Sequence, residues 1–243
     1  MSETEQGYNP EPQQSTPVES WDADNKRFTV ERSYPLGDEL DKIKVALAGD
    51  IVIQGTDGQP SLIIRESVEG DQEDTARMHY QFEMDTLHVQ PKGKEITVAD
   101  KLDPAAERRA LMQGRPLIRR NVVISVPSEK AIRCNLETRS DGDDVTIQDV
   151  TLKNPHIEST GTVTCKNVAI QGLGQIQAEG EVDVGFRNDS LSMTLRGGHV
   201  KFPEAFLPEE LMDGAVLGTF GSEPSPENRL SLTSPKKVTF EKV

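Results

Sequence analysis

The sequence has few aromatic residues, little positive charge and no long apolar run. Aromatics make up 5% of the 243 residues, and 27 lysines and arginines face 41 aspartates and glutamates, which leaves a net charge of −14. Nucleic-acid binding needs clustered positive charge, so this balance argues against a nucleic-acid partner. No stretch approaches the roughly 20 apolar residues of a membrane helix. No basic residue or apolar run precedes Lys26, so we expect neither a transmembrane segment nor a secretory signal.

Cysteine is also scarce, with only Cys134 and Cys165 in the chain. Each cysteine is in phase with the alternating apolar residues of a strand-like segment, but the two segments are different strands. This pattern predicts buried, reduced thiols that pack as small hydrophobes rather than a disulfide. Two cysteines without a secretory signal fit a reducing compartment, so we expect a cytoplasmic protein.

The N-terminal segment is acidic and low in apolar residues. Its first 24 residues contain six acids and no lysine or arginine. Such a segment cannot bury enough apolar surface to offset the entropy of ordering, which predicts a disordered tail over residues 1–27. A docking motif around Trp21 is the alternative to a merely solubilising tail.

Short alternating apolar runs begin at about Phe28 and predict strands. Helical signals are few. Asp103 and Pro104 form an N-cap and a first-turn proline, and Gly114 is a C-terminal glycine, so we expect a helix of about three turns within an insertion over about 92–120. A second helix is expected around 208–212.

Internal repetition is the most informative pattern in the sequence. Glycines recur 19 residues apart, and apolar residues at fixed offsets from them recur every 18 to 21 residues. One column consists of Val145, Val163, Val182 and Val200, and a second of Leu136, Ile157, Ile176 and Leu195. Segments beginning at Val45 and at Leu232 fit the same template.

A period near 19 with strand-type alternation predicts one coil of a solenoid per unit, because a single coil cannot offset its ordering entropy and must stack. We therefore expect an all-β domain over 28–243, a parallel β-solenoid or β-roll of about five coils. Glycine at each corner is expected to supply positive φ. The apolar stretch over about 203–228 is expected to form a cap or lid, with an oligomer interface as the alternative.

The same segments resemble a bacterial "putative adhesin" domain of unknown function. The resemblance lies in VALAGDIVIQG, TLHVQP, RNVVISVPSEKAIRCNLETRSDGDDVTIQ, TGTVTCKNVAIQG, EGEVDVGF and RLSLTSPKKVTFEKV. It covers about two thirds of the chain. It implies a β-solenoid-like fold and carries over no catalytic residue.

The candidate chemical groups do not form a recognisable site. His79, His88, His156 and His199 lack metal-ligand spacing and are expected on the surface. Outward acids could chelate Ca²⁺ or act as an acid/base pair. The residues at equivalent positions of successive repeats are not all acids, however, which favours a solvated acidic face. We predict no catalytic residue, no metal and no cofactor.

One basic patch interrupts the acidic chain, within the insertion. It consists of Arg108, Arg109, Arg115, Arg119 and Arg120. Such a patch could hold an anionic ligand or the acidic tail by charge-assisted pairing. The alternatives are a merely solvated insertion and an interaction surface, and our hypothesis is that any interaction surface of the protein is this patch.

The sequence therefore predicts a non-enzymatic scaffold or protein-interaction module with an unknown protein partner and possible homo-oligomerisation. A polymer-forming cytoskeletal β-helix is the first alternative. A carbohydrate-binding or carbohydrate-active β-helix protein is the second, and it would need a carboxylate pair fixed over a groove.

Overall fold

The computed structural model describes residues 15–83, 87–100, 118–212, 215–220 and 227–243. It confirms the all-β class. One helix, α1 (Glu73–Glu83), occurs in the part of the chain that the structure describes. The strands are β1 (Val18–Asp22), β2 (Arg27–Pro35), β3 (Lys42–Leu47), β4 (Asp50–Thr56), β5 (Ser61–Glu69), β6 (Leu87–Lys92), β7 (Glu95–Asp100), β8 (Arg119–Pro127), β9 (Ala131–Thr138), β10 (Val145–Gln148), β11 (Thr151–Ser159), β12 (Val163–Gln171), β13 (Leu173–Ala178), β14 (Val182–Phe186), β15 (Leu191–Lys201), β16 (Phe206–Met212), β17 (Ala215–Phe220) and β18 (Arg229–Lys242).

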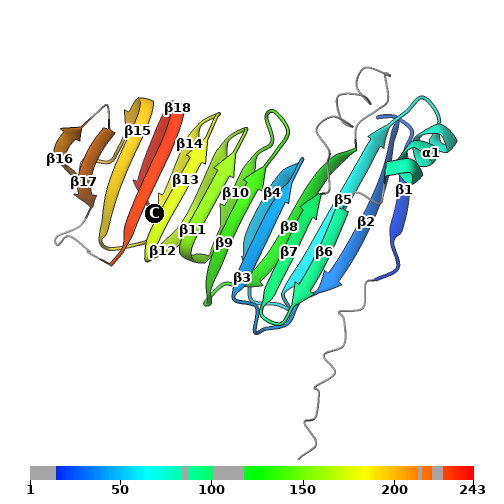
Figure 1. The fold of residues 1–243 in the computed structure, drawn as a ribbon, viewed down its shortest axis with the longest axis horizontal. Coiled ribbons are helices and arrows are strands. Elements are labelled where there is room, and N and C mark those ends of the chain that lie inside the picture. The colour runs from blue at the N-terminus through cyan, green and yellow to red at the C-terminus, as the bar shows by residue number, and fades with distance from the viewer. Residues whose placement is uncertain (1–14, 84–86, 101–117, 213–214, 221–226) are drawn as a thin grey trace, which may run out of the picture.

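The strands lie side by side along an elongated body (Figure 1). Their pairings follow two ladders. The β3 ladder runs β6–β7–β3–β9–β11–β13–β18–β15–β17–β16. The β4 ladder runs β1–β2–β5–β8–β4–β10–β12–β14–β18–β15.

Five parallel strands close into a barrel where the two ladders join. In the ring β11–β12–β14–β18–β13, each strand pairs with the next and β13 pairs back with β11. The remaining strands extend from this ring. The interior is filled by alternate apolar side chains, because successive residues of a strand point to opposite faces.

The core follows columns that the sequence analysis aligned. Ile51 pairs with Val145, Val145 with Val163, and Val163 with Val182, and all four side chains are fully buried. Val182 then pairs with Val238 of β18. The fourth member of the predicted column, Val200, pairs with Val238 instead of Val182.

The order of strands in space is not their order in the chain. β3 lies between β7 and β9, and β4 lies between β8 and β10. At the other end, β18 lies between β13 or β14 and β15, and it is parallel to all three. The C-terminal strand is therefore an interior strand, and the pairing of β15, β17 and β16 with the rest of the two ladders runs through it.

The prediction of a uniformly parallel body is wrong at both ends. β2 is antiparallel to β1 and β5, β5 to β8, and β6 to β7. β17 is antiparallel to β15 and β16. Tight turns connect antiparallel neighbours with few residues, whereas each parallel pairing needs a full crossover.

Several predicted elements differ from the structure. Residues 208–212 lie in strand β16, so a helix there is wrong. The tail prediction does not hold for Val18–Asp22, which forms β1, because pairing with β2 satisfies its backbone. The insertion was expected to begin at about residue 92, but Glu95–Asp100 forms strand β7 of the sheet. The helix expected over 105–113 lies outside the described residues.

Candidate functional site: a basic strand face and a buried ion network

The structure separates the predicted arginine patch. Arg108, Arg109 and Arg115 lie outside the described residues. Arg119 is exposed at the start of β8, whereas Arg120 is 5% exposed and points inward. The prediction that Arg120 belongs to an exposed interaction patch is therefore wrong, because its guanidinium contacts the buried carboxylates of Glu66 and Asp100.

Glu66 is the centre of this buried ion network. Its Oε1 accepts a hydrogen bond from Arg120 Nε at 2.9 Å, and its Oε2 accepts one from the Tyr80 hydroxyl at 2.8 Å. Arg32 NH1 lies 2.9 Å from the same Oε2, and Arg32 also donates to the Tyr80 hydroxyl. Burial and the charge of Glu66 raise the pKa of Tyr80, so its hydroxyl stays protonated.

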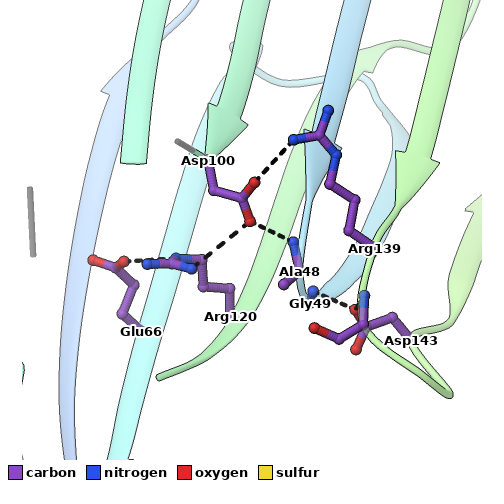
Figure 2. A network of polar contacts seen from close by, with 8 residues as sticks. Ala48, Gly49, Glu66, Asp100, Arg120, Arg139 and Asp143 are labelled. Carbon is purple, nitrogen blue, oxygen red and sulfur yellow. Dashed lines mark hydrogen bonds and ion pairs between the residues drawn. The ribbon is translucent and has the colours of Figure 1, made fainter. Parts of the chain in front are cut away.

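Asp100, at the end of β7, extends the network to the β3–β4 turn (Figure 2). Its Oδ2 accepts the Ala48 backbone N–H at 2.6 Å and lies 3.9 Å from Arg120 NH1. Its Oδ1 accepts from Arg139 NH1 at 3.2 Å. Beside it, Asp143 Oδ2 accepts the Gly49 N–H at 2.6 Å.

This arrangement favours a structural role for the network. The four oxygens of Glu66 and Asp100 each have a partner, so neither carboxylate is poised to take or deliver a proton to a substrate. Removing two carboxylates from water is costly unless their lone pairs are satisfied, and here they are. The network fixes β5, β7 and β8 to one another at one place.

Alternation along the strands could have revealed the network. Glu66 stands between the inward Ile64 and Val68, and Arg120 is two residues before the inward Val122. A glutamate and an arginine at inward-facing positions of two adjacent strands predict a buried ion pair. Arg120 stands beside other arginines in the sequence, so charge alone groups it with the patch, whereas its position in the alternation of β8 places it in the core.

A second arrangement of charge lies on the outer face of the β3 ladder. Arg133 pairs in register with Lys42 on one side and with Lys153 on the other. Three cations therefore stand on three consecutive strands, β3, β9 and β11, about 4.8 Å apart. Like charges directly opposite one another destabilise a sheet, so this column costs folding free energy.

The neighbouring strands supply the other charges of this face. Glu95 bonds both Lys42 Nζ at 2.9 Å and Lys44 Nζ at 2.8 Å, and these bonds lower the pKa of Glu95 to about 2. Arg133 and Lys153 are exposed and form no ion pair within the described part of the chain. We call the outward residues Lys92, Lys42, Lys44, Arg133 and Lys153 the basic face.

The sequence contains a partial signal for the basic face. Lys42 precedes Val45 by three residues, and Arg133 precedes Leu136 by three, so both occupy one offset of the repeat. Lys153 precedes Ile157 by four, because the register of β11 shifts between Lys153 and His156. That irregularity hides the third member from an alignment by offset.

The remaining candidate groups have ordinary roles. Cys134 and Cys165 are free and buried as predicted, and burial raises the pKa of each thiol to about 12. Asp50 and Asp144 each accept a backbone N–H, from Asp144 and Thr162, and so hold strand corners together. Among the residues described, no group of three or more His, Cys, Asp or Glu could hold a metal ion.

The described residues thus define an all-β protein whose β3 ladder carries a basic outer face. None of its described helices is long and apolar enough to cross a membrane. No family model matches the chain, and no curated protein matches it significantly.

Solved structures with a similar arrangement have low identity to this chain. A "putative cell adhesion protein" from Clostridium sporogenes is 11% identical with a TM-score of 0.45, over 87% of this chain and 98% of that one. A "putative adhesin" from Bacteroides fragilis is 14% identical with a TM-score of 0.43, over 88% and 97%. A "putative lipid binding protein" from Parabacteroides distasonis is 12% identical with a TM-score of 0.30, over 88% and 96%. At these values the names carry no argument for the function of this chain.

Proposed function

We propose that this protein is a non-enzymatic interaction module that binds an acidic polypeptide segment on its basic face. The observation that carries the proposal is the column Lys42, Arg133 and Lys153, whose cations stand on consecutive strands. Two of the three have no carboxylate partner within the described residues. A bound anion would relieve their mutual repulsion, and the strand backbones already hold the three side chains in one row.

Charge elsewhere on the molecule favours a short acidic segment over a long polyanion. The chain carries a net charge of −14, so a nucleic acid that extended beyond the basic face would meet repulsion. The face spans the five strands β6, β7, β3, β9 and β11, which is about 20 Å across the ladder. An extended peptide of about six residues covers that length.

Binding of a defined peptide tests the proposal. The probe is a fluorescein-labelled peptide with alternating glutamate and serine, and its glutamine counterpart is the control. We expect binding that weakens as salt rises and is lost in the double variant Arg133→Gln with Lys153→Gln. The matched control is Lys166→Gln with Lys201→Gln, which removes two exposed cations elsewhere. Equal binding by both double variants would contradict the proposal.

The polymer-forming alternative is disfavoured by two of the ladder edges. Edge strand β6 contains Pro91, and edge strand β16 contains Pro208 with a register shift next to it. Proline lacks the N–H that a further strand would need, and bulges twist an edge away from pairing.

We also propose that the middle of the body is a stack of coils and that the protein is cytoplasmic. Between residues 131 and 186, partners in parallel register lie 18 to 21 residues apart, which supports a short stack of coils in the middle of the body. Two free, buried thiols fit a cytoplasmic location, where thiols stay reduced.

A further inference from the structure

The neighbouring strands β9 and β11 carry a second pair of like charges on the outer face of the β3 ladder. Glu137 pairs in register with Glu158, four residues further along β9 than the pairing of Arg133 with Lys153. All four side chains are exposed. At about 3.3 Å per residue, the acidic pair lies about 13 Å from the cationic pair. Like charges stand directly opposite one another in both pairs, so each pair costs folding free energy.

A row of amide and imidazole side chains lies between the two charged pairs. Asn135 of β9 pairs with His156 of β11, and His156 pairs with Gln175 of β13. All three are exposed. Such side chains donate and accept hydrogen bonds, so this row can bond the backbone of an extended chain that crosses the strands. The face therefore offers cations, backbone partners and anions in three successive rows.

The present partners of the two glutamates are exposed. Glu137 lies 3.2 Å from Arg139, and Glu158 lies 3.2 Å from His156. About half of each glutamate side chain is open to solvent, at 49%. Exposed ion pairs contribute little to stability, because water screens them and ordering the side chains costs entropy. A cation supplied by a ligand can therefore replace these contacts.

We infer that the ligand of the basic face is an extended segment with acidic side chains along one edge and basic side chains along the other. Successive side chains of an extended chain point to opposite sides. When such a segment crosses the strands over the middle row, its acidic edge meets Arg133 and Lys153. Its basic edge meets Glu137 and Glu158. This inference rests on the proposed function, since it names the class of segment that the same surface selects.

The net charge of the chain also favours this amphoteric segment over a purely acidic one. A segment that alternates acid and base has no net charge, so the −14 of the chain does not repel it at a distance. A purely acidic segment is attracted by Arg133 and Lys153 but repelled by Glu137 and Glu158. The two glutamates therefore set specificity through both attraction and repulsion.

Three labelled peptides of about eight residues test the inference. The first alternates glutamate and lysine and so separates the two charges by edge. The second repeats Glu-Glu-Lys-Lys, which has the same composition and net charge but mixes both charges on each edge. The third is the alternating glutamate–serine peptide. We expect the wild type to bind the first about three- to tenfold more tightly than the second, because the basic edge then gains two exposed ion pairs.

The double variant Glu137→Gln with Glu158→Gln should shift the affinities of two peptides in opposite directions. It should abolish the preference for the glutamate–lysine peptide over its Glu-Glu-Lys-Lys isomer. It should also strengthen binding of the glutamate–serine peptide about two- to threefold, because like charge is removed. The matched control, Glu204→Gln with Glu241→Gln, changes net charge equally through exposed acids elsewhere and should keep the preference.

The two proposals fail in different ways. Equal binding of the two glutamate–lysine isomers by the wild type would overturn the amphoteric inference, and so would a preference that survives in the Glu137→Gln, Glu158→Gln variant. The interaction module would still stand if the glutamate–serine peptide binds and loses its affinity in the Arg133→Gln, Lys153→Gln variant. If none of the three peptides binds the wild type, the proposed function itself is wrong.

Discussion

Close backbone approach explains two of the three recurring glycines, whereas Gly142 has the predicted positive φ, at 84°, and no atom within 4 Å of its Cβ position. A Cβ on Gly161 would lie 2.5 Å from the Asp143 carbonyl oxygen, and one on Gly180 would lie 2.5 Å from the Gly161 carbonyl oxygen. Neither glycine has positive φ. Positive φ is also found at Asp149 (57°) and Asn167 (52°), residue types that tolerate this region.

Alanine at one of these corners tests that explanation. Gly161→Ala places a methyl group against the fixed backbone of the neighbouring strand connection, so we expect a loss of about 1–3 kcal/mol in the free energy of unfolding. Gly37→Ala is the control, because nothing lies within 4 Å of its Cβ position, and it should stay within about 0.5 kcal/mol. Urea denaturation followed by circular dichroism measures both. Equal midpoints would refute the steric account.

The buried ion network predicts a large effect from a single truncation. Glu66→Ala leaves Arg120 buried at 5% exposure without its main partner, and the expected cost is about 3–5 kcal/mol. Joint replacement, Glu66→Met with Arg120→Met, should restore part of this loss because the Arg120 charge is then no longer stranded, although Arg32 still loses Glu66 and Asp100 still loses Arg120. An exposed pair serves for comparison: Arg65→Met, which breaks the contact with Glu31, should cost at most about 1 kcal/mol. A double variant as unstable as Glu66→Ala would argue against stranded charge as the cause.

The lowered pKa of Glu95 predicts that the free energy of unfolding falls at low pH. Its bonds to Lys44 and Lys42 lower the pKa from 4.5 to about 2, so the folded state binds this proton more weakly than the unfolded state does. The resulting stabilisation is present above about pH 4.5 and is lost as the pH falls towards 2. Glu95→Gln should therefore remove part of the acid sensitivity. Carboxyl chemical shifts followed during titration give the pKa, and a midpoint near 4.5 would disprove the lowering.

At the scale of elements, alternation identified the ladders but not their order. Leu232 and Val238 match the template of the inward columns, and both are buried. Their offsets do not specify neighbours, because β18 could stack at the end or insert between earlier strands with the same pattern. Only the length and position of every connection decide that choice. Helix α1 was missed because just two of its described apolar side chains, Ala76 and Tyr80, are buried.

The interior position of β18 predicts an unequal response to proline. Ser231 pairs with Gln175 on one side and Thr194 on the other, so Ser231→Pro removes a donor from the middle of the ladder. We expect destabilisation of about 3 kcal/mol or more. His88→Pro in edge strand β6 changes a residue with one pairing partner and should cost less. Similar urea midpoints for the two variants would contradict the interior placement of β18.

At the scale of the molecule, net charge alone does not show where cations gather on the surface. The −14 of the chain excludes a basic character overall, yet the basic face gathers cations from β6, β3, β9 and β11. These residues are far apart in sequence and meet only through strand pairing. Within the predicted arginine patch the reverse holds for Arg119 and Arg120, which are adjacent in sequence but point to opposite faces of β8.

The edges of the body predict how the molecule behaves at high concentration. β1 is five residues long and carries Glu19, while β6 and β16 contain Pro91 and Pro208. Such edges resist strand addition, so sedimentation velocity should give a monomer over a wide range of concentration. Pro91→Thr with Pro208→Thr supplies the missing donors and should increase self-association, whereas Pro10→Thr, in the N-terminal segment, should not. Filaments of the unmodified protein in electron micrographs would show that these edges do not protect it.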